Sequence, residues 1–216
     1  MNPCLKKGEH GIFLQERKNF VSFFCSIIDP MKTRQNQIFA NAAPLGLFGF
    51  AMTTVLLNIQ NAGFFSLSVM IMSMGVFFGG IAQIIAGILE WRRANGFGAL
   101  AFISYGSFWL TLIFIWVAPH AGLTSADPVS MGWYLTMWGL FTAVLFLCTL
   151  RGNTIGKCIF GTLVILFFML AFANFMESHF LHTLAGYVGI LCGGFAFYEA
   201  SALVLNERYE RTVLPL

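Results

Sequence analysis

Six long apolar stretches dominate this sequence. Each is close to the roughly 20 residues that a helix needs to cross a bilayer. Of the 216 residues, 58% are hydrophobic and only 10% are charged, which leaves too little polar surface for a water-soluble domain. No alternating strand pattern is present. We therefore predict an all-α integral membrane protein, a bundle of six transmembrane helices at about Pro44–Ala62, Phe64–Leu89, Phe97–Val117, Val129–Leu150, Cys158–Met176 and Leu184–Leu205.

The lysines and arginines predict the orientation of these helices. All twelve lie in the N-terminal segment, in the second-to-third and fourth-to-fifth connections, or after the sixth helix. Cationic residues favour the cytoplasmic side of a membrane. Placing all of them there requires both termini in the cytoplasm and an even number of helices, and six satisfies this requirement.

The first part of the chain differs from the rest. Residues 1–37 carry six cationic side chains around an apolar run, Phe20–Ile28, that is too short to span a bilayer. We interpret 1–37 as a cytoplasmic tail and 38–216 as the six-helix transmembrane domain. The tail could instead lie on the membrane surface or be disordered, or translation could begin at Met31. No small-residue cleavage site of a signal peptide follows the apolar run.

The first predicted helix is unusually polar for a membrane span. It contains Thr53, Thr54 and Asn58, and Asn61 stands near its end. Phe50, Thr54, Asn58 and Asn61 share one helical face, because their spacings are four, four and three. Polar side chains have no partners in lipid, so this face should point at other helices or at a solute pathway.

Other polar residues interrupt the later helices. Gln83, Ser104 and Asn174 are candidates for lining a pathway, and Asn174 shares a face with Leu163 and Phe167. Glu90 stands beside Arg92 and Arg93, so an ion pair at the membrane surface accounts for it. A thin set of neutral polar groups suits a small, weakly charged solute better than a metal ion.

Two other classes of function remain open at this point. Glu177, His179 and His182 lie close together between the fifth and sixth helices and could serve a membrane-embedded enzyme. A structural or sensory membrane protein is the other alternative. The five cysteines contain no C-x-x-C pair, so we predict neither a metal site nor a cofactor.

Two G-x-x-x-G pairs, Gly75–Gly79 and Gly189–Gly193, lie in apolar helices. Such pairs permit helices to approach closely. The pattern does not distinguish contacts within one bundle from contacts between subunits.

Three stretches resemble one known family. Asn41–Gly63 (NAAPLGLFGFAMTTVLLNIQNAG), Gly79–Leu110 and Val204–Leu216 are similar, in order, to the acetate uptake transporters, or succinate–acetate permeases. Asn41, Pro44, Leu45 and Gly46 match the family's N-P-A-P-L-G-L motif, with Ala42 where the family usually has proline. Pro44 still falls in the first helical turn, where a missing N–H has little effect.

The resemblance implies a function that composition alone does not name. It implies uptake of acetate and related small carboxylates, succinate included, by a multi-pass protein of the inner or plasma membrane. It also implies a homo-hexamer with a solute pathway inside each protomer, in contact with lipid and with no nucleic-acid partner. By the family motif, Phe50, Tyr105 and Leu163 would form a hydrophobic constriction that gates this pathway.

Overall fold

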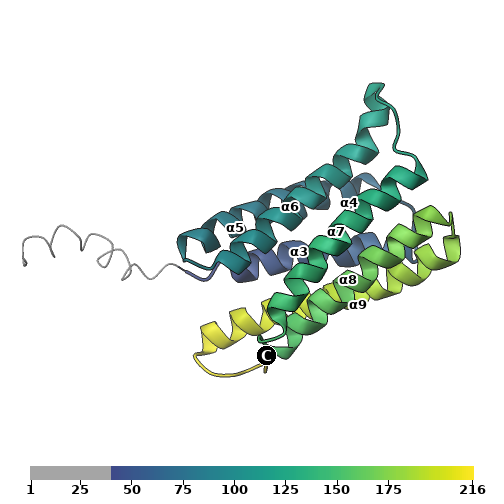
Figure 1. The fold of residues 1–216 in the computed structure, drawn as a ribbon. Helices are drawn as coiled ribbons and strands as arrows, with labels where there is room; N and C mark the ends of the chain where they lie inside the picture. Colours follow the sequence, from purple (N-terminus) through teal and green to yellow (C-terminus); the bar gives the residue numbers. More distant parts are fainter. Residues whose placement is uncertain (1–39) are drawn as a thin grey trace, which may run out of the picture. The chain divides into compact units, whose positions relative to one another are not determined.

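The computed structural model describes residues 40–216, within which Asn41–Leu216 is one all-helical unit (Figure 1). Six of its helical segments are long and apolar enough to cross a membrane, as predicted. The predicted tail at 1–37 lies outside the described residues. The helices are α3 (Ala43–Asn61), α4 (Val69–Met74), the π-helix η2 (Gly75–Ala82), α5 (Gln83–Arg92), α6 (Gly96–Val117), the 3₁₀-helix η3 (Ala118–Ala121), α7 (Pro128–Thr149), α8 (Thr154–Phe175) and α9 (His179–Tyr209).

Polar capping residues decide where several helices begin. The side chains of Asp127, Asn153 and Ser178 accept hydrogen bonds from backbone amides at the starts of α7, α8 and α9. The Ser130 amide lies 2.6 Å from Asp127 Oδ1, and this bond holds the pKa of the Asp127 carboxyl below its usual value. With these caps, α8 starts four residues before the span predicted for it. The helix α9 has 31 residues and extends beyond its own predicted span at both ends.

The second span contains a feature that the sequence did not predict. Between α4 and α5 the chain forms the wider turns of a π-helix over Gly75–Ala82. Neighbouring helices approach this segment very closely. A Cβ on Gly79 would lie 2.8 Å from Thr53 Oγ1 of α3, and a Cβ on Gly49 would lie 2.7 Å from the Phe78 carbonyl oxygen. Glycine is therefore required on both sides of this contact.

The six spans follow one another around a ring. α9 packs on α3, α3 on η2 and α5, and α5 on α6, while on the other side α9 packs on α8 and α8 on α7. Figure 1 shows α7 and α8 side by side. The ring closes between α6 and α7 through long side chains, with Phe108 stacked on Tyr134 at 5.9 Å and the Thr111 hydroxyl 2.7 Å from that of Tyr134. We call this contact the α6–α7 seam.

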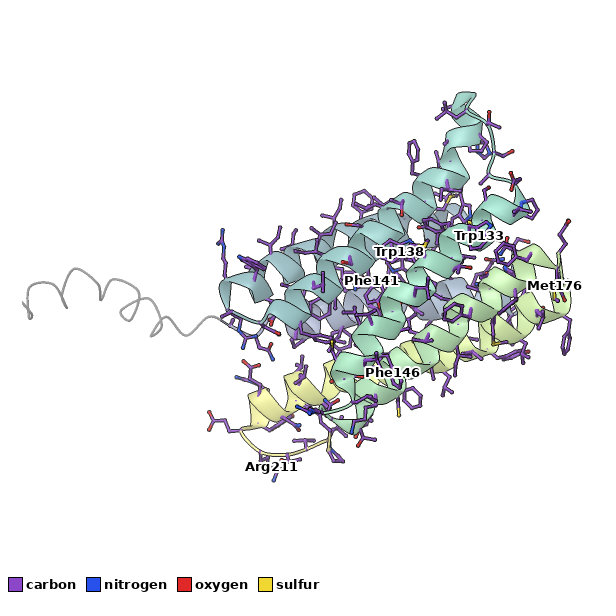
Figure 2. All side chains as sticks on the ribbon, viewed as in Figure 1. Trp133, Trp138, Phe141, Phe146, Met176 and Arg211 are labelled. Carbon is purple, nitrogen blue, oxygen red and sulfur yellow. The ribbon has the colours of Figure 1, made fainter. Side chains whose placement is uncertain are left out.

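The two ends of the bundle differ in charge. The six lysines and arginines of residues 40–216 lie in, or within about one helical turn of, the α5–α6 connection, the α7–α8 connection and the C-terminus of α9, and these three places lie at one end because the helices alternate in direction. We call this the basic end. Arg211 belongs to it, and Figure 2 shows Met176 at the opposite end of the bundle.

Glu90 ties the start of α3 to the basic end. Its carboxylate is fully buried and pairs with Arg93 at 2.7 Å, which is the ion pair expected from the sequence. It also accepts hydrogen bonds from the Ala42 amide at 3.1 Å and from Asn95 Nδ2 at 2.6 Å. Asn41 Oδ1 accepts from Arg93 at 2.7 Å and from the Ala43 amide at 3.2 Å. The family motif is thus held against the α5–α6 turn.

Both glycine pairs serve contacts inside the bundle. A Cβ on Gly189 would overlap the side chain of Asn58 on α3. A Cβ on Gly75 would lie 3.0 Å from Ile113 and 3.2 Å from Trp109, both on α6. Each position therefore belongs to a helix–helix contact within the protomer.

Candidate functional site

A cavity of about 330 Å³ opens at the basic end, inside the ring of helices. Residues from α3, α5, α6, α7, α8 and α9 line it, together with residues of the α5–α6 and α7–α8 connections. Most of its wall is apolar. The polar side chains among its lining residues are those of Gln83, Asn95, Tyr105, Cys148, Thr149, Asn153 and Glu199.

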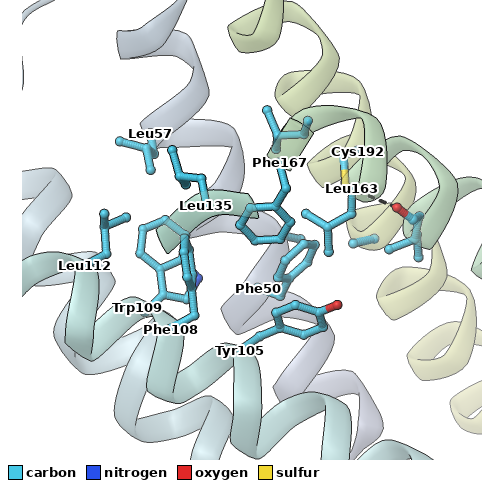
Figure 3. Close-up of a cluster of buried hydrophobic side chains, with 14 of the residues drawn as sticks. Phe50, Leu57, Tyr105, Phe108, Trp109, Leu112, Leu135, Leu163, Phe167 and Cys192 are labelled. Atoms are coloured by element: carbon cyan, nitrogen blue, oxygen red, sulfur yellow. Dashed lines mark hydrogen bonds between the residues drawn. The ribbon is translucent and has the colours of Figure 1, made fainter. Parts of the chain in front are cut away.

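Three side chains from three different helices lie together in the wall of this cavity. They are Phe50 of α3, Tyr105 of α6 and Leu163 of α8, and all three are buried. Figure 3 shows them pointing toward one another, and the rings of Phe50 and Tyr105 are 5.8 Å apart. We call these three residues the apolar collar. The structure thus brings together the residues that the family resemblance selected.

A hydrogen bond across the α6–α7 seam fixes the position of Tyr105. Its hydroxyl donates to Thr142 Oγ1 at 3.0 Å, and Thr142 in turn donates to the Trp138 carbonyl at 2.7 Å. The Tyr105 ring also contacts Phe141 and Phe160, with centroids 5.9 Å and 6.3 Å away. The phenol therefore has little freedom to rotate.

A second apolar layer, which the sequence did not predict, lies beside the collar. Phe108 of α6 packs edge-on against Phe167 of α8 at 5.2 Å and against Trp138 of α7 at 5.3 Å. Phe167 and Leu163 are four residues apart on α8, which was the available sequence signal for this layer. No pattern on α6 or α7 indicated that Phe108 and Trp138 meet them.

Gln83 is the most unusual polar group in the cavity wall. It lies at the junction of η2 and α5, and its side chain is only 1% exposed. Within residues 40–216, its Oε1 atom is buried and has no hydrogen-bond partner. An unsatisfied buried acceptor costs about 1–3 kcal/mol, so a side-chain movement that turns this oxygen into the cavity, where a donor can reach it, would be favoured.

A larger and more polar hollow of about 660 Å³ lies at the opposite end. Asn61, Asn174, His179 and His182 are among its lining residues, and Asn174 also lines a smaller neighbouring cavity. The two histidines were expected in a loop, but they occupy the first turn of α9 because Ser178 caps that helix. Within residues 40–216, no group of three or more histidine, cysteine, aspartate or glutamate side chains could hold a metal ion.

The remaining candidate pathway residues line neither hollow. Thr53 donates to the Gly49 carbonyl at 2.5 Å and faces Gly79 of η2. Asn58 donates to the Thr54 carbonyl at 2.9 Å and accepts from Asn61 at 3.2 Å. Ser104 is half-buried on α6. Thr53 and Asn58 therefore satisfy their polar groups in or beside α3.

These features define a class of protein. A ring of six membrane-spanning helices encloses hollows at both ends, and apolar side chains lie between them. This arrangement is typical of a membrane protein that conducts a small solute.

Comparison with known proteins identifies the family. The chain belongs to the GPR1/FUN34/yaaH family, whose model matches residues 24–215. It is 49% identical over 182 residues to the succinate-acetate/proton symporter SatP of Escherichia coli K12, covering 84% of this chain and 97% of that protein. It is 36% identical to the ammonia transport outward protein 2 of Saccharomyces cerevisiae, covering 79% of this chain and 63% of that protein.

A solved structure supports the same assignment. The structure of the bacterial acetate channel SatP matches with a TM-score of 0.81 and 49% identity, covering 82% of this chain and 98% of that chain. The family resemblance seen in the sequence is thereby confirmed, and so is the fold of six spans. The protein is a multi-pass protein of an inner or plasma membrane. Both SatP proteins are named as a transporter or a channel, not as an enzyme.

Proposed function

We propose that this protein carries acetate and related small carboxylates, succinate included, across the membrane through the ring of helices. The observation that supports this most directly is the cavity at the basic end, which reaches the apolar collar and holds few polar groups. The relatives named above, a succinate-acetate/proton symporter and an acetate channel, make acetate the solute to test first.

The proposed function has a direct test. Purified protein in proteoliposomes should take up radiolabelled acetate, and unlabelled acetate should compete with that uptake. Empty liposomes report the passive leak of the neutral acid at the same pH. Uptake that never exceeds this leak over a range of pH would contradict the proposal.

We further propose that the apolar collar gates the pathway. A carboxylate loses hydration when it passes between a phenylalanine, a tyrosine and a leucine, and strongly hydrated ions lose the most. A small carboxylate in its neutral acid form meets a lower barrier. Once a side-chain movement turns it into the cavity, the Gln83 oxygen can accept a hydrogen bond from that acid. Thr53, Thr54, Asn58, Ser104 and Asn174 remain candidates for later contacts along the route.

The protomers are also proposed to form a homo-hexamer, as the family resemblance implies. Gly75 and Gly189 contact helices of their own protomer, so the subunit contacts should involve the exposed apolar faces of the helices instead. Native mass spectrometry in mild detergents should detect six copies. A monomer in every detergent would contradict this assembly.

A further inference from the structure

Glu199 of α9 is a carboxylate in the wall of the cavity at the basic end. It is half-buried, and its Oε1 atom accepts a hydrogen bond from Asn153 Nδ2 at 2.7 Å. Among the described residues it is the only acidic side chain that lines this cavity. Neither the hydropathy of α9 nor the family resemblance assigns it a function.

Glu199 has no ion-pair partner within residues 40–216. Within residues 40–216, the ion pair that the structure contains joins Glu90 to Arg93, and Arg93 also binds Asn41. Asn153 supplies a neutral donor to Glu199. The two buried or half-buried glutamates at this end therefore differ, because Glu90 has a cationic partner and Glu199 has a neutral one.

A carboxylate without an ion-pair partner, in the wall of a cavity, acts on the charge of whatever passes it. The repulsion is proportional to the charge of the solute, and it weakens less with distance in a cavity than in bulk water. A dicarboxylate carries a second negative charge past this site, whereas a monocarboxylate carries one charge or, as the acid, none.

We propose that Glu199 selects against a second negative charge, so that the pathway favours monocarboxylates such as acetate over dicarboxylates such as succinate. This inference rests on the proposed function and specifies its substrate class. Glu199 does not need to touch the solute for this effect, since the repulsion acts across the cavity.

The test compares succinate and acetate fluxes into the same proteoliposomes at one pH. Glu199→Gln keeps an acceptor for Asn153 and removes the charge. The succinate-to-acetate flux ratio should rise on the order of tenfold, which is what one unit charge roughly 10 Å away produces at an effective dielectric constant of about 20. Acetate uptake itself should be retained.

A matched control and a second variant make the test specific. Glu207→Gln removes an exposed carboxylate from the same end of α9 that does not line the cavity, and it should leave the ratio unchanged. Leu203→Lys leaves Glu199 in place and adds a cation four residues later on the same face, beside the cavity, so it should also raise the ratio.

The outcomes separate this inference from the function on which it rests. If Glu199→Gln and Leu203→Lys both transport acetate at the parental ratio, Glu199 does not select by charge. If Glu199→Gln does not reach the membrane, the flux ratio of Leu203→Lys alone tests the selection by charge. A parent protein without acetate flux would overturn the proposed function, and the selection by Glu199 with it.

Discussion

Phe50 and Leu163 enter the apolar collar as purely apolar side chains, so truncating either one should widen it. We expect Phe50→Ala and Leu163→Ala to raise the flux of larger carboxylates, such as butyrate, relative to acetate. Each truncation should also lower the free energy of unfolding by about 2–5 kcal/mol, as for other buried leucines and phenylalanines. Flux ratios in proteoliposomes measure the first effect, and thermal melting measures the second.

Leu112→Ala supplies the matched control for these variants. Leu112 is as deeply buried as Leu163, at 3% exposure, but it does not line the cavity. It should lose comparable stability without any change in selectivity. Folded collar variants that keep the parental preference for acetate would show that these residues are not the gate.

Tyr105→Phe tests the hydroxyl of the collar alone. The variant keeps the ring contacts with Phe50 and Phe141 and loses the hydrogen bond to Thr142, a loss of about 1 kcal/mol. We expect the rate of acetate transport to change while expression and monodispersity stay near those of the parent. Tyr134→Phe removes the other tyrosine hydroxyl of the α6–α7 seam, away from the cavity, and should leave transport unaltered.

Gln83→Leu separates stability from function at one residue. Because Gln83 Oε1 is buried without a partner, leucine should maintain or raise the thermal stability of the protein. Acetate flux should nevertheless fall, since the wall of the cavity loses a polar group that can accept a hydrogen bond from the solute. A variant that is destabilised and transports normally would show that Gln83 serves packing instead.

The sequence predicted part of this site, for physical reasons. Helical spacing placed Phe50 and Leu163 on faces that also carry polar residues. Both side chains proved to be buried, while Asn61 and Asn174 at the ends of these faces are half-buried. The same spacing selected Thr53, Thr54 and Asn58 without distinguishing the cavity wall from the contact between two helices. That distinction depends on which helices are neighbours in the ring, and a single helix does not encode it. The second apolar layer, in which Phe108 meets Phe167 and Trp138, was not predicted for the same reason.

At the scale of elements, the α3–α9 contact depends on glycine. Gly189→Ala should destabilise the protein, because the added methyl group overlaps Asn58. Gly194→Ala, on the same helix, meets nothing within 4 Å and should be neutral or stabilising by up to about 1 kcal/mol. Size-exclusion chromatography after heating measures how much of each variant stays folded. Equal loss of the two variants would contradict the close contact between Gly189 and Asn58.

The spans themselves could be predicted more reliably than their ends. Hydropathy detects the part of a helix that lies in lipid, which suffices to count six spans. It does not detect caps such as Ser178, so α9 proved longer than its apolar stretch. The π-helix at Gly75–Ala82 lies in close contact with α3 and α6, and hydropathy carries no signal for it.

At the scale of the whole molecule, the charge pattern predicts that the basic end is cytoplasmic. After replacement of the five native cysteines, single cysteines at Ser125 and Ser178 should react with an impermeant thiol reagent from outside the cell. A cysteine at Asn153, at the basic end, should react only after the membrane is permeabilised. If only the cysteine at position 153 reacts from outside, the orientation is the reverse of the predicted one.

The α6–α7 seam has a consequence for how proteins of this architecture can diverge. Contacts in which glycine brings two backbones together, as between α3 and α9, tolerate almost no change in side-chain size. The seam is instead closed by rings of Tyr105, Phe108, Tyr134 and Trp138, whose sizes can change one substitution at a time while the helix axes stay in place. New solute preferences should therefore arise most readily by mutation along this seam, with the other helix contacts serving as a constant frame.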